Sequence, residues 1–159
     1  MPDGLYERDF LVWSETQVDL LRRLAAGERV NALLDWDNLI DEVGDLGRSE
    51  LNACESYLRQ AMVHLSKLHT WPDSPDCNHW RDEVAEFLIG ARKRWTASMR
   101  QRIDLQDTYS DALRRFAMAG GDRTAVPAQC PFTLDALLAR DTDLAALLTW
   151  PTPPEAPPC

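Results

Sequence analysis

The stretch LDWDNLIDEVGDLGRSE, residues 34–50, is rich in carboxylates at helical spacing. Asp37, Asp41 and Asp45 follow one another at intervals of four and would share one face of a helix. Such carboxylates can bind Mg²⁺ or act as a general acid and base, but they more often form a solvated face. The apolar residues between them are expected to face inward: Leu39, Ile40, Val43 and Leu46. We therefore interpret the three aspartates as facing water.

A helical-bundle enzyme is the main alternative, with His64 working beside Glu42 or Asp45. Arg48 can pair back to Asp45, three residues earlier, within one turn of helix, whereas a pairing with Glu42, six residues earlier, would need the helix to distort. Metal sites in helical bundles use inward-facing Glu-x-x-His pairs, and the chain has no such spacing, so neither a metal nor a cofactor is predicted. No catalytic residue is assigned. The candidate polar cluster comprises Glu42, Asp45, Arg48, His64 and Lys67.

The three histidines match no zinc module. His64 and His69 are five residues apart and cannot face one point on a straight helix, and His79 follows a proline-containing loop. A site that joined His64 to Cys77 and His79 would need distant turns to converge. Because His64 lies among apolar positions, we favour a partly buried polar residue with a hydrogen-bond partner.

A basic run that contains a tryptophan, RKRWTASMRQR (92–102), could bind single-stranded nucleic acid. Trp95 is expected to point inward, so that the basic residues fan over the opposite face: Arg92, Lys93, Arg94, Arg100 and Arg102. That face suits the acidic 35–50 helix of the same chain or of a second copy, and we favour this use. The net charge of −9 also argues against a nucleic-acid partner.

Length and composition fit a single soluble domain over residues 1–150. No apolar run is long enough to cross a membrane, and the N-terminus lacks the features of a secretory signal, so a cytoplasmic protein is expected. The cysteines form no C-x-x-C pair and are expected to be free thiols: Cys54, Cys77, Cys130 and Cys159. Phosphate-binding, dinucleotide-binding, zinc-protease and nucleophile-elbow motifs are also missing from the sequence.

Helical periodicity covers most of the chain, and no segment alternates with period two. Helices are expected over 7–26, 37–47, 49–69, 80–103 and 109–117, with short ones over 133–140 and 142–148. The first is expected to bury one stripe: Phe10, Trp13, Leu20, Leu21 and Leu24. The third carries a bundle seam: Leu51, Cys54, Leu58, Ala61, Leu65 and Leu68. Gly44 and Gly47 suggest a kink or a close helix–helix approach, so that 37–69 is one kinked helix or two.

The predicted fold is all-α, a helical bundle of about four longer helices with short C-terminal helices and a Pro-rich tail over 151–159. Five blocks in order resemble the bacterial family called domain of unknown function 29: YERDFLVW (6–13), residues 34–50, LRQAMVHLSK (58–67), HWRDEVAEF (79–87) and CPFTLDALL (130–138). The resemblance implies an all-α fold around a helical bundle and no established activity. The pair Asp41-Glu42 departs from the family pattern, which usually has two glutamates at these positions.

These observations favour a non-enzymatic cytoplasmic module that acts through protein–protein contacts, with a protein partner or with further copies of itself. The metal-dependent enzyme that uses His64 with Glu42 or Asp45 and the nucleic-acid-associated protein that uses residues 92–102 are the alternatives.

Overall fold

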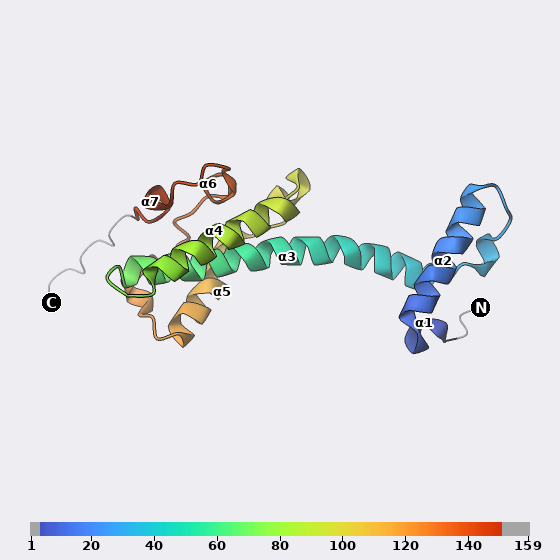
Figure 1. The fold of residues 1–159 in the computed structure, drawn as a ribbon, viewed down its shortest axis with the longest axis horizontal. Coiled ribbons are helices and arrows are strands. Elements are labelled where there is room, and N and C mark those ends of the chain that lie inside the picture. The colour runs from blue at the N-terminus through green and yellow to red at the C-terminus, as the bar shows by residue number, and fades with distance from the viewer. Residues whose placement is uncertain (1–3, 151–159) are drawn as a thin grey trace. The chain divides into compact units, whose positions relative to one another are not determined.

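The computed structural model describes residues 4–150, and every regular element within them is a helix (Figure 1). The N-terminal elements are α1 (Leu5–Arg8), α2 (Phe10–Ala25) and the short 3-10 helix η1 (Asn31–Leu33). The elements that follow are α3 (Trp36–Thr70), α4 (Cys77–Arg94), η2 (Ala97–Gln101), α5 (Leu105–Met118), η3 (Arg123–Ala125), α6 (Leu134–Leu138) and α7 (Leu144–Leu147). The predicted all-α class is confirmed, with α2, α3, α4 and α5 as the longer helices. The tail predicted over 151–159 lies outside the described residues.

The chain divides into two compact units, residues 1–49 and residues 50–159. Both contain part of α3, because the helices predicted over 37–47 and 49–69 are one continuous helix. Glycine inside a helix costs only about 1 kcal/mol relative to alanine, so two glycines do not end it. A single domain over residues 1–150 stays a prediction.

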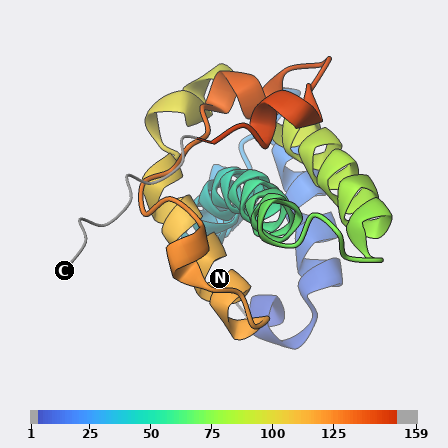
Figure 2. The ribbon, with the colours of Figure 1, turned by 90° about the vertical axis from the view of Figure 1, so that its left-hand side faces the viewer.

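The core of residues 50–159 lies between the C-terminal part of α3, α4 and α5. The predicted seam of α3 is buried in it, with Leu51 partly exposed and the remaining members inside: Cys54, Leu58, Ala61, Leu65 and Leu68. Figure 2 shows α4, α5 and the α6–α7 segment arranged around α3. The periodicity of the seam therefore predicts the face that α3 buries.

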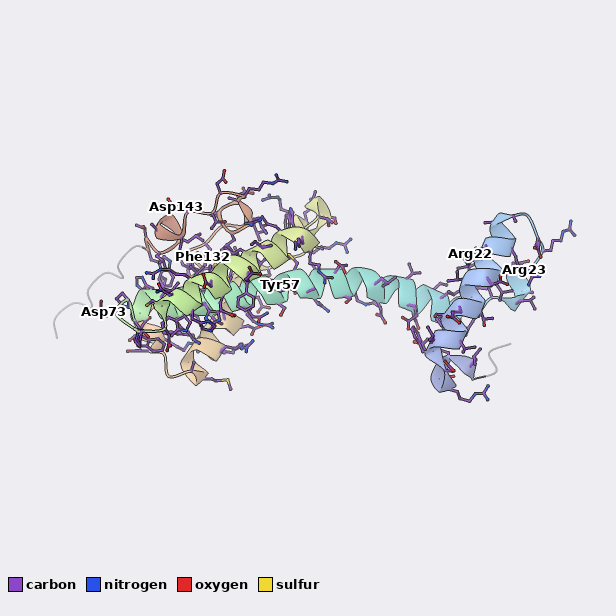
Figure 3. The ribbon with its side chains drawn as sticks, in the orientation of Figure 1. Arg22, Arg23, Tyr57, Asp73, Phe132 and Asp143 are labelled. Carbon is purple, nitrogen blue, oxygen red and sulfur yellow. The ribbon has the colours of Figure 1, made fainter. Side chains whose placement is uncertain are left out.

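α3 and α4 approach closely where Gly90 faces the ring of Tyr57, a side chain labelled in Figure 3. A Cβ at Gly90 would lie 2.9 Å from Cε1 and Cζ of Tyr57, closer than side chains normally pack. The predicted close approach at Gly44 and Gly47 is not found in the described chain. Within the described residues, a Cβ at Gly47 would meet nothing within 4 Å, and the three atoms nearest to one at Gly44 belong to the guanidinium of Arg48.

α4 ends at Arg94, so the prediction of a helix that continues to Ile103 is wrong. The N–H of Trp95 still donates to the carbonyl of Ala91, but its backbone is extended, and the chain turns into η2. This turn brings Met99 and Ile103 into the core, where Trp95 packs as predicted. No glycine or proline lies between Ala91 and Ile103 to signal the end of the helix.

Residues 1–49 have a small core of Leu20, Val30 and Leu34, with Leu24 and Leu39 packed against it. The helix predicted over 7–26 is interrupted at Asp9, whose carboxylate accepts a hydrogen bond from the N–H of Val12 and caps α2. The predicted inward stripe is correct at Trp13 and Leu20 and wrong at Phe10 and Leu21, which are exposed.

The largest correction concerns α3. Its residues Ile40, Val43 and Leu46 were predicted to face inward, and all three are exposed. The aspartates Asp37, Asp41 and Asp45 are exposed as predicted. Periodicity groups residues on a face, but it does not say whether another element covers that face.

Candidate functional site

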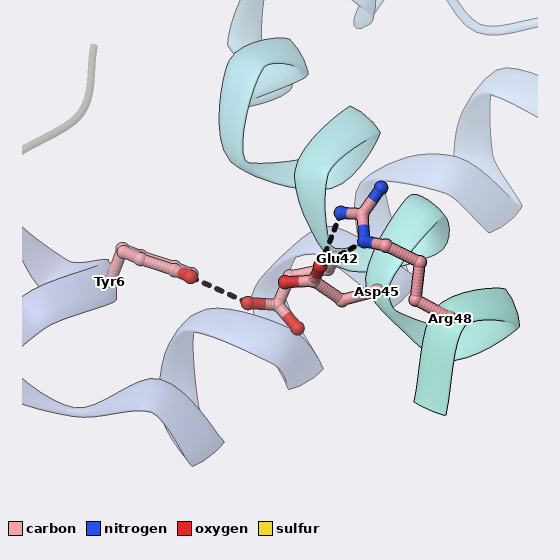
Figure 4. Close-up of polar contacts among 4 residues, drawn as sticks. All are labelled: Tyr6, Glu42, Asp45 and Arg48. Atoms are coloured by element: carbon pink, nitrogen blue, oxygen red, sulfur yellow. Dashed lines mark hydrogen bonds and ion pairs between the residues drawn. The ribbon is translucent and has the colours of Figure 1, made fainter. Parts of the chain in front are cut away.

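Tyr6 and Glu42 join α1 to α3 within residues 1–49 (Figure 4). The Tyr6 hydroxyl donates a 2.5 Å hydrogen bond to Oε1 of Glu42. On the next turn of α3, Arg48 donates from Nε to Oδ1 of Asp45 at 3.0 Å and also from Nη2 to the same oxygen. Arg48 thus pairs with Asp45, one of its two predicted partners, whereas Glu42 binds a tyrosine 36 residues away.

Tyr6 is a hydrogen-bond donor rather than a base. Its hydrogen bond to Glu42, followed by desolvation and the charges of Glu42, Asp41 and Asp45, raises the pKa of Tyr6 to about 12. The phenol is therefore protonated at physiological pH. The Tyr6 ring lies edge-on to the ring of Trp13, with centroids 4.9 Å apart, which fixes the position of the hydroxyl.

Asp35 fixes the start of α3. Its Oδ2 accepts hydrogen bonds from Nε1 of Trp13 at 3.0 Å and from Nδ2 of Asn38 at 2.8 Å, and its N–H donates to the side chain of Gln17. The hydrogen bond from Asn38, ahead of that from Trp13, lowers the pKa of Asp35 below its usual value. Sequence reasoning missed these contacts with α2 because they join residues about twenty positions apart.

His64 lies on the part of α3 that faces α4. Its ring stacks on Phe87 with centroids 5.6 Å apart, and its Nε2 lies 3.9 Å from Oε2 of Glu83. Nδ1 is buried and has no hydrogen-bond partner among residues 4–150. Burial, ahead of the charge of Lys67, lowers the pKa of His64, which favours the neutral ring. His64 is partly buried as predicted, but in the part of the chain that the structure describes neither nitrogen has the predicted hydrogen-bond partner.

The predicted polar cluster divides between the two units. The Lys67 ammonium lies 5.7 Å from the ring centre of Trp80, so Lys67 and His64 both contact α4. Glu42, Asp45 and Arg48 make their contacts within residues 1–49. A catalytic role for the five residues stays a prediction. In residues 4–150, no three His, Cys, Asp or Glu side chains lie close enough together to hold a metal ion.

Two arginines of the predicted basic face bind other parts of residues 50–159. Arg92 donates from Nη1 to the carbonyl of Ala139 at 2.9 Å and lies 3.4 Å from Oγ1 of Thr142. Arg94 forms a 2.6 Å ion pair with Glu50, the last acid of the 34–50 stretch. The expected pairing of the basic face with the acidic 35–50 helix of the same chain therefore occurs at Arg94.

The rest of the basic face is more exposed. Arg100 forms a 2.7 Å ion pair with Asp135, and its guanidinium lies 5.7 Å from the ring centre of Trp95. Lys93 and Arg102 are exposed. Within the described residues, three of the five bases therefore have partners of their own. That this face does not serve a nucleic acid stays a prediction.

An exposed apolar surface runs along the first turns of α3. We call it the apolar stripe, and its members are Trp36 (45% exposed), Ile40 (66%), Val43 (67%) and Leu46 (68%). The spacing of four and then three residues keeps Trp36, Ile40 and Val43 on one side of the helix. The apolar periodicity of the sequence groups Ile40, Val43 and Leu46 on one face, and only the structure shows that this face is exposed.

Three of the four cysteines lie in the described residues. Cys54, Cys77 and Cys130 are free, as predicted, and Cys159 lies outside the described residues. Burial raises the pKa of Cys54 to about 11 and also raises the pKa of Cys130, so neither is an activated nucleophile. Among the helices of residues 4–150, none is both long and apolar enough to cross a membrane.

Comparison with known proteins agrees with the all-helical fold. A crystal structure of an alpha-helical protein of unknown function from Rhodospirillum rubrum is similar, with 30% sequence identity and a TM-score of 0.69. The similarity covers 90% of this chain and 94% of that one. No curated protein matches. The family model described as domain of unknown function DUF29 matches residues 5–142. The chain therefore belongs to the DUF29 family, as the five sequence blocks predict.

Proposed function

We propose that this chain is a non-enzymatic, cytoplasmic protein-binding module and that the apolar stripe of α3 is its contact surface. One observation carries the proposal. Ten of the eleven large apolar side chains that are exposed in the described residues lie between Phe10 and Leu46. Residues 50–150 bury their large apolar side chains in one extended core, whereas residues 4–49 have only a small core and leave ten such side chains exposed. Exposed apolar residues concentrated in this way are typical of an interaction site.

The size of the stripe indicates a transient complex. Its four side chains expose roughly 500 Å² together, within the range of the largest apolar patches on monomers, which are often functional. A contact of this area on each partner lies at the low end of specific interfaces, where association is weak and reversible. We therefore expect a dissociation constant in the micromolar range.

Charge favours a basic partner. Residues 1–50 contain twelve acids and five bases, and Asp37 and Asp41 are exposed beside the stripe. Arg48 is engaged with Asp45 and leaves the other carboxylates without compensation from α3. The partner that fits is an amphipathic helix whose apolar face is bordered by lysine and arginine. A second copy that presented the same stripe would bring carboxylates against carboxylates, which opposes a symmetric dimer.

A pair of synthetic helical peptides tests the proposal on the full chain. Both carry leucine at helical spacing, and one has lysine and the other glutamate at every flanking position. The lysine peptide is expected to bind with a micromolar Kd that weakens as salt increases, because part of the attraction is electrostatic. The glutamate peptide is expected not to bind. Fluorescence anisotropy of labelled peptides measures both affinities.

Matched variants place the binding on the stripe. Val43→Glu replaces an exposed residue of the stripe and should weaken binding of the lysine peptide at least tenfold. Met118→Glu makes the same change at an exposed residue of α5, 88% exposed, and should leave the affinity unchanged. Equal binding of both peptides, no binding of either, or equal effects of the two variants would each refute the proposal. Light scattering tests for self-association. If the chain self-associates and Val43→Glu abolishes this, the stripe binds a second copy, and the proposal of a basic partner is refuted.

A further inference from the structure

The geometry points to a second binding site, between α4 and the α6–α7 connection, that takes a small organic anion with an apolar body. The site is a cavity of about 220 Å³ in residues 50–159. It is separate from the apolar stripe and does not rest on the proposed function. Its floor is a face of α4 made by Val84, Ala85, Leu88 and Ile89, and Leu144 from α7 faces it.

Among residues 4–150, three arginines and no carboxylate line this cavity. Arg81 and Arg92 come from the same face of α4, three turns apart, and Arg140 comes from the segment opposite. Within the described residues none of the three forms an ion pair with an acidic side chain, although the chain as a whole has a net charge of −9. Two acids lie in the same segment: Asp141 is exposed between Arg140 and Thr142, and Asp143, labelled in Figure 3, accepts from the N–H of Ala146 as the N-cap of α7.

Arg92 is held in place before any ligand arrives. Its Nη1 donates to the carbonyl of Ala139 at 2.9 Å, and Thr142 donates to the same carbonyl at 2.7 Å. The side chain is partly buried, so its orientation is fixed by both packing and hydrogen bonds. Nε and Nη2 of Arg92 make no hydrogen bond within the described chain, and a guanidinium with free donors suits a carboxylate or phosphate.

The volume limits the ligand. A dry cavity of about 150 Å³ can hold a benzene molecule, so this one suits a body of about six carbons with a charged head group. Apolar contact with Val84 and Leu88 selects for the body, and the lining arginines select for the negative head. A purely structural role for Arg92, as a tie between α4 and the α6–α7 connection, would leave Arg81 and Arg140 without a function in the cavity.

Isothermal titration of the full chain with hexanoate, hexanol and hexylammonium at constant ionic strength tests the assignment. Hexanoate is expected to bind, and hexanol and hexylammonium are expected to bind at least tenfold more weakly. Hexyl phosphate in a fourth titration compares the two anionic head groups, and tighter binding of either one supports the anion site. Equal affinity for hexanoate and hexylammonium, or no binding of either anion, would overturn it.

Charge-removing variants locate the binding. Arg81→Gln and Arg140→Gln change exposed side chains and are expected to leave the helical circular dichroism unchanged, while each weakens hexanoate binding several-fold and the pair at least tenfold. Arg123→Gln, at an exposed arginine of η3 that does not line the cavity, is the matched control. A loss with Arg123→Gln equal to that with Arg140→Gln would show a general charge effect and contradict the site.

Discussion

Replacing Gly90 by alanine should destabilise the protein even though alanine is the better helix former. The new Cβ would lie 2.9 Å from two atoms of the Tyr57 ring and 3.0 Å from a third. Carbon atoms pack best at about 3.5–4.0 Å, so the ring or the helix must move. Overpacking of this kind lowers the free energy of unfolding by about 1–3 kcal/mol, and the better helix propensity of alanine raises it by about 1 kcal/mol. The expected net loss is therefore about 1 kcal/mol, and at most about 2 kcal/mol.

A double-mutant cycle with Tyr57→Leu separates the steric cost from other effects. Leucine removes the ring that the new methyl group would strike, so Gly90→Ala should become neutral or stabilising in that background. The coupling between the two changes should be about 2 kcal/mol, in the range measured for residues in contact. Urea unfolding followed by circular dichroism gives the four free energies of unfolding.

Gly47→Ala is the control for helix propensity. A Cβ at this position meets nothing within 4 Å in the described residues, so the change should stabilise the protein by about 0.5–1 kcal/mol. If Gly90→Ala stabilised the protein as much as Gly47→Ala, or had the same effect with and without the Tyr57 ring, the close approach of α3 and α4 would be refuted.

Three further outcomes follow from the same contacts. Ultraviolet titration should show the Tyr6 phenol ionising near pH 12, and Glu42→Gln should return its pKa towards 10. Because this pKa is raised on folding, the stability from the bond is complete below pH 10 and is lost as the pH rises towards 12. Cys54, buried and with a pKa of about 11, should react with Ellman's reagent only after unfolding in urea. Gly121→Ala should cost more than 2 kcal/mol in the same urea assay, because its Cβ would lie 2.4 Å from the fully buried ring of Phe116.

The sequence was most informative where one element covers another. The seam from Leu51 to Leu68 predicts the buried face of α3 because α4 and α5 pack against it. The same kind of pattern at Ile40 and Val43 predicts burial that does not occur. Apolar periodicity measures the common direction of side chains, and burial depends on a covering element that a local pattern does not contain.

Contacts distant in sequence explain the remaining differences. The Asp45–Arg48 pair spans one helical turn and could be predicted from spacing, whereas Tyr6 and Glu42 meet only because α1 folds back to α3. The end of α4 at Arg94 carries no glycine or proline, and it follows from the packing of Met99 into the core. The cavity between α4 and the α6–α7 connection unites residues about fifty positions apart, which no motif marks.

The two glycines of the stretch GDLGR, Gly44 and Gly47, lower the stability of α3, and their places beside the apolar stripe explain why they are there. Gly44 leaves space for the guanidinium of Arg48 to lie along the helix and reach Asp45, which keeps that charge off the stripe. Gly47 follows Ile40 by seven residues and Val43 by four, so it lies on the stripe itself. No described side chain fills the space beside it. If a partner helix docks there as proposed, its backbone can come close only because this position has no side chain. Gly47 then lowers the stability of α3 and also allows the partner helix to come close. Gly47→Ala should therefore raise the stability of the free chain and lower its affinity for the lysine peptide.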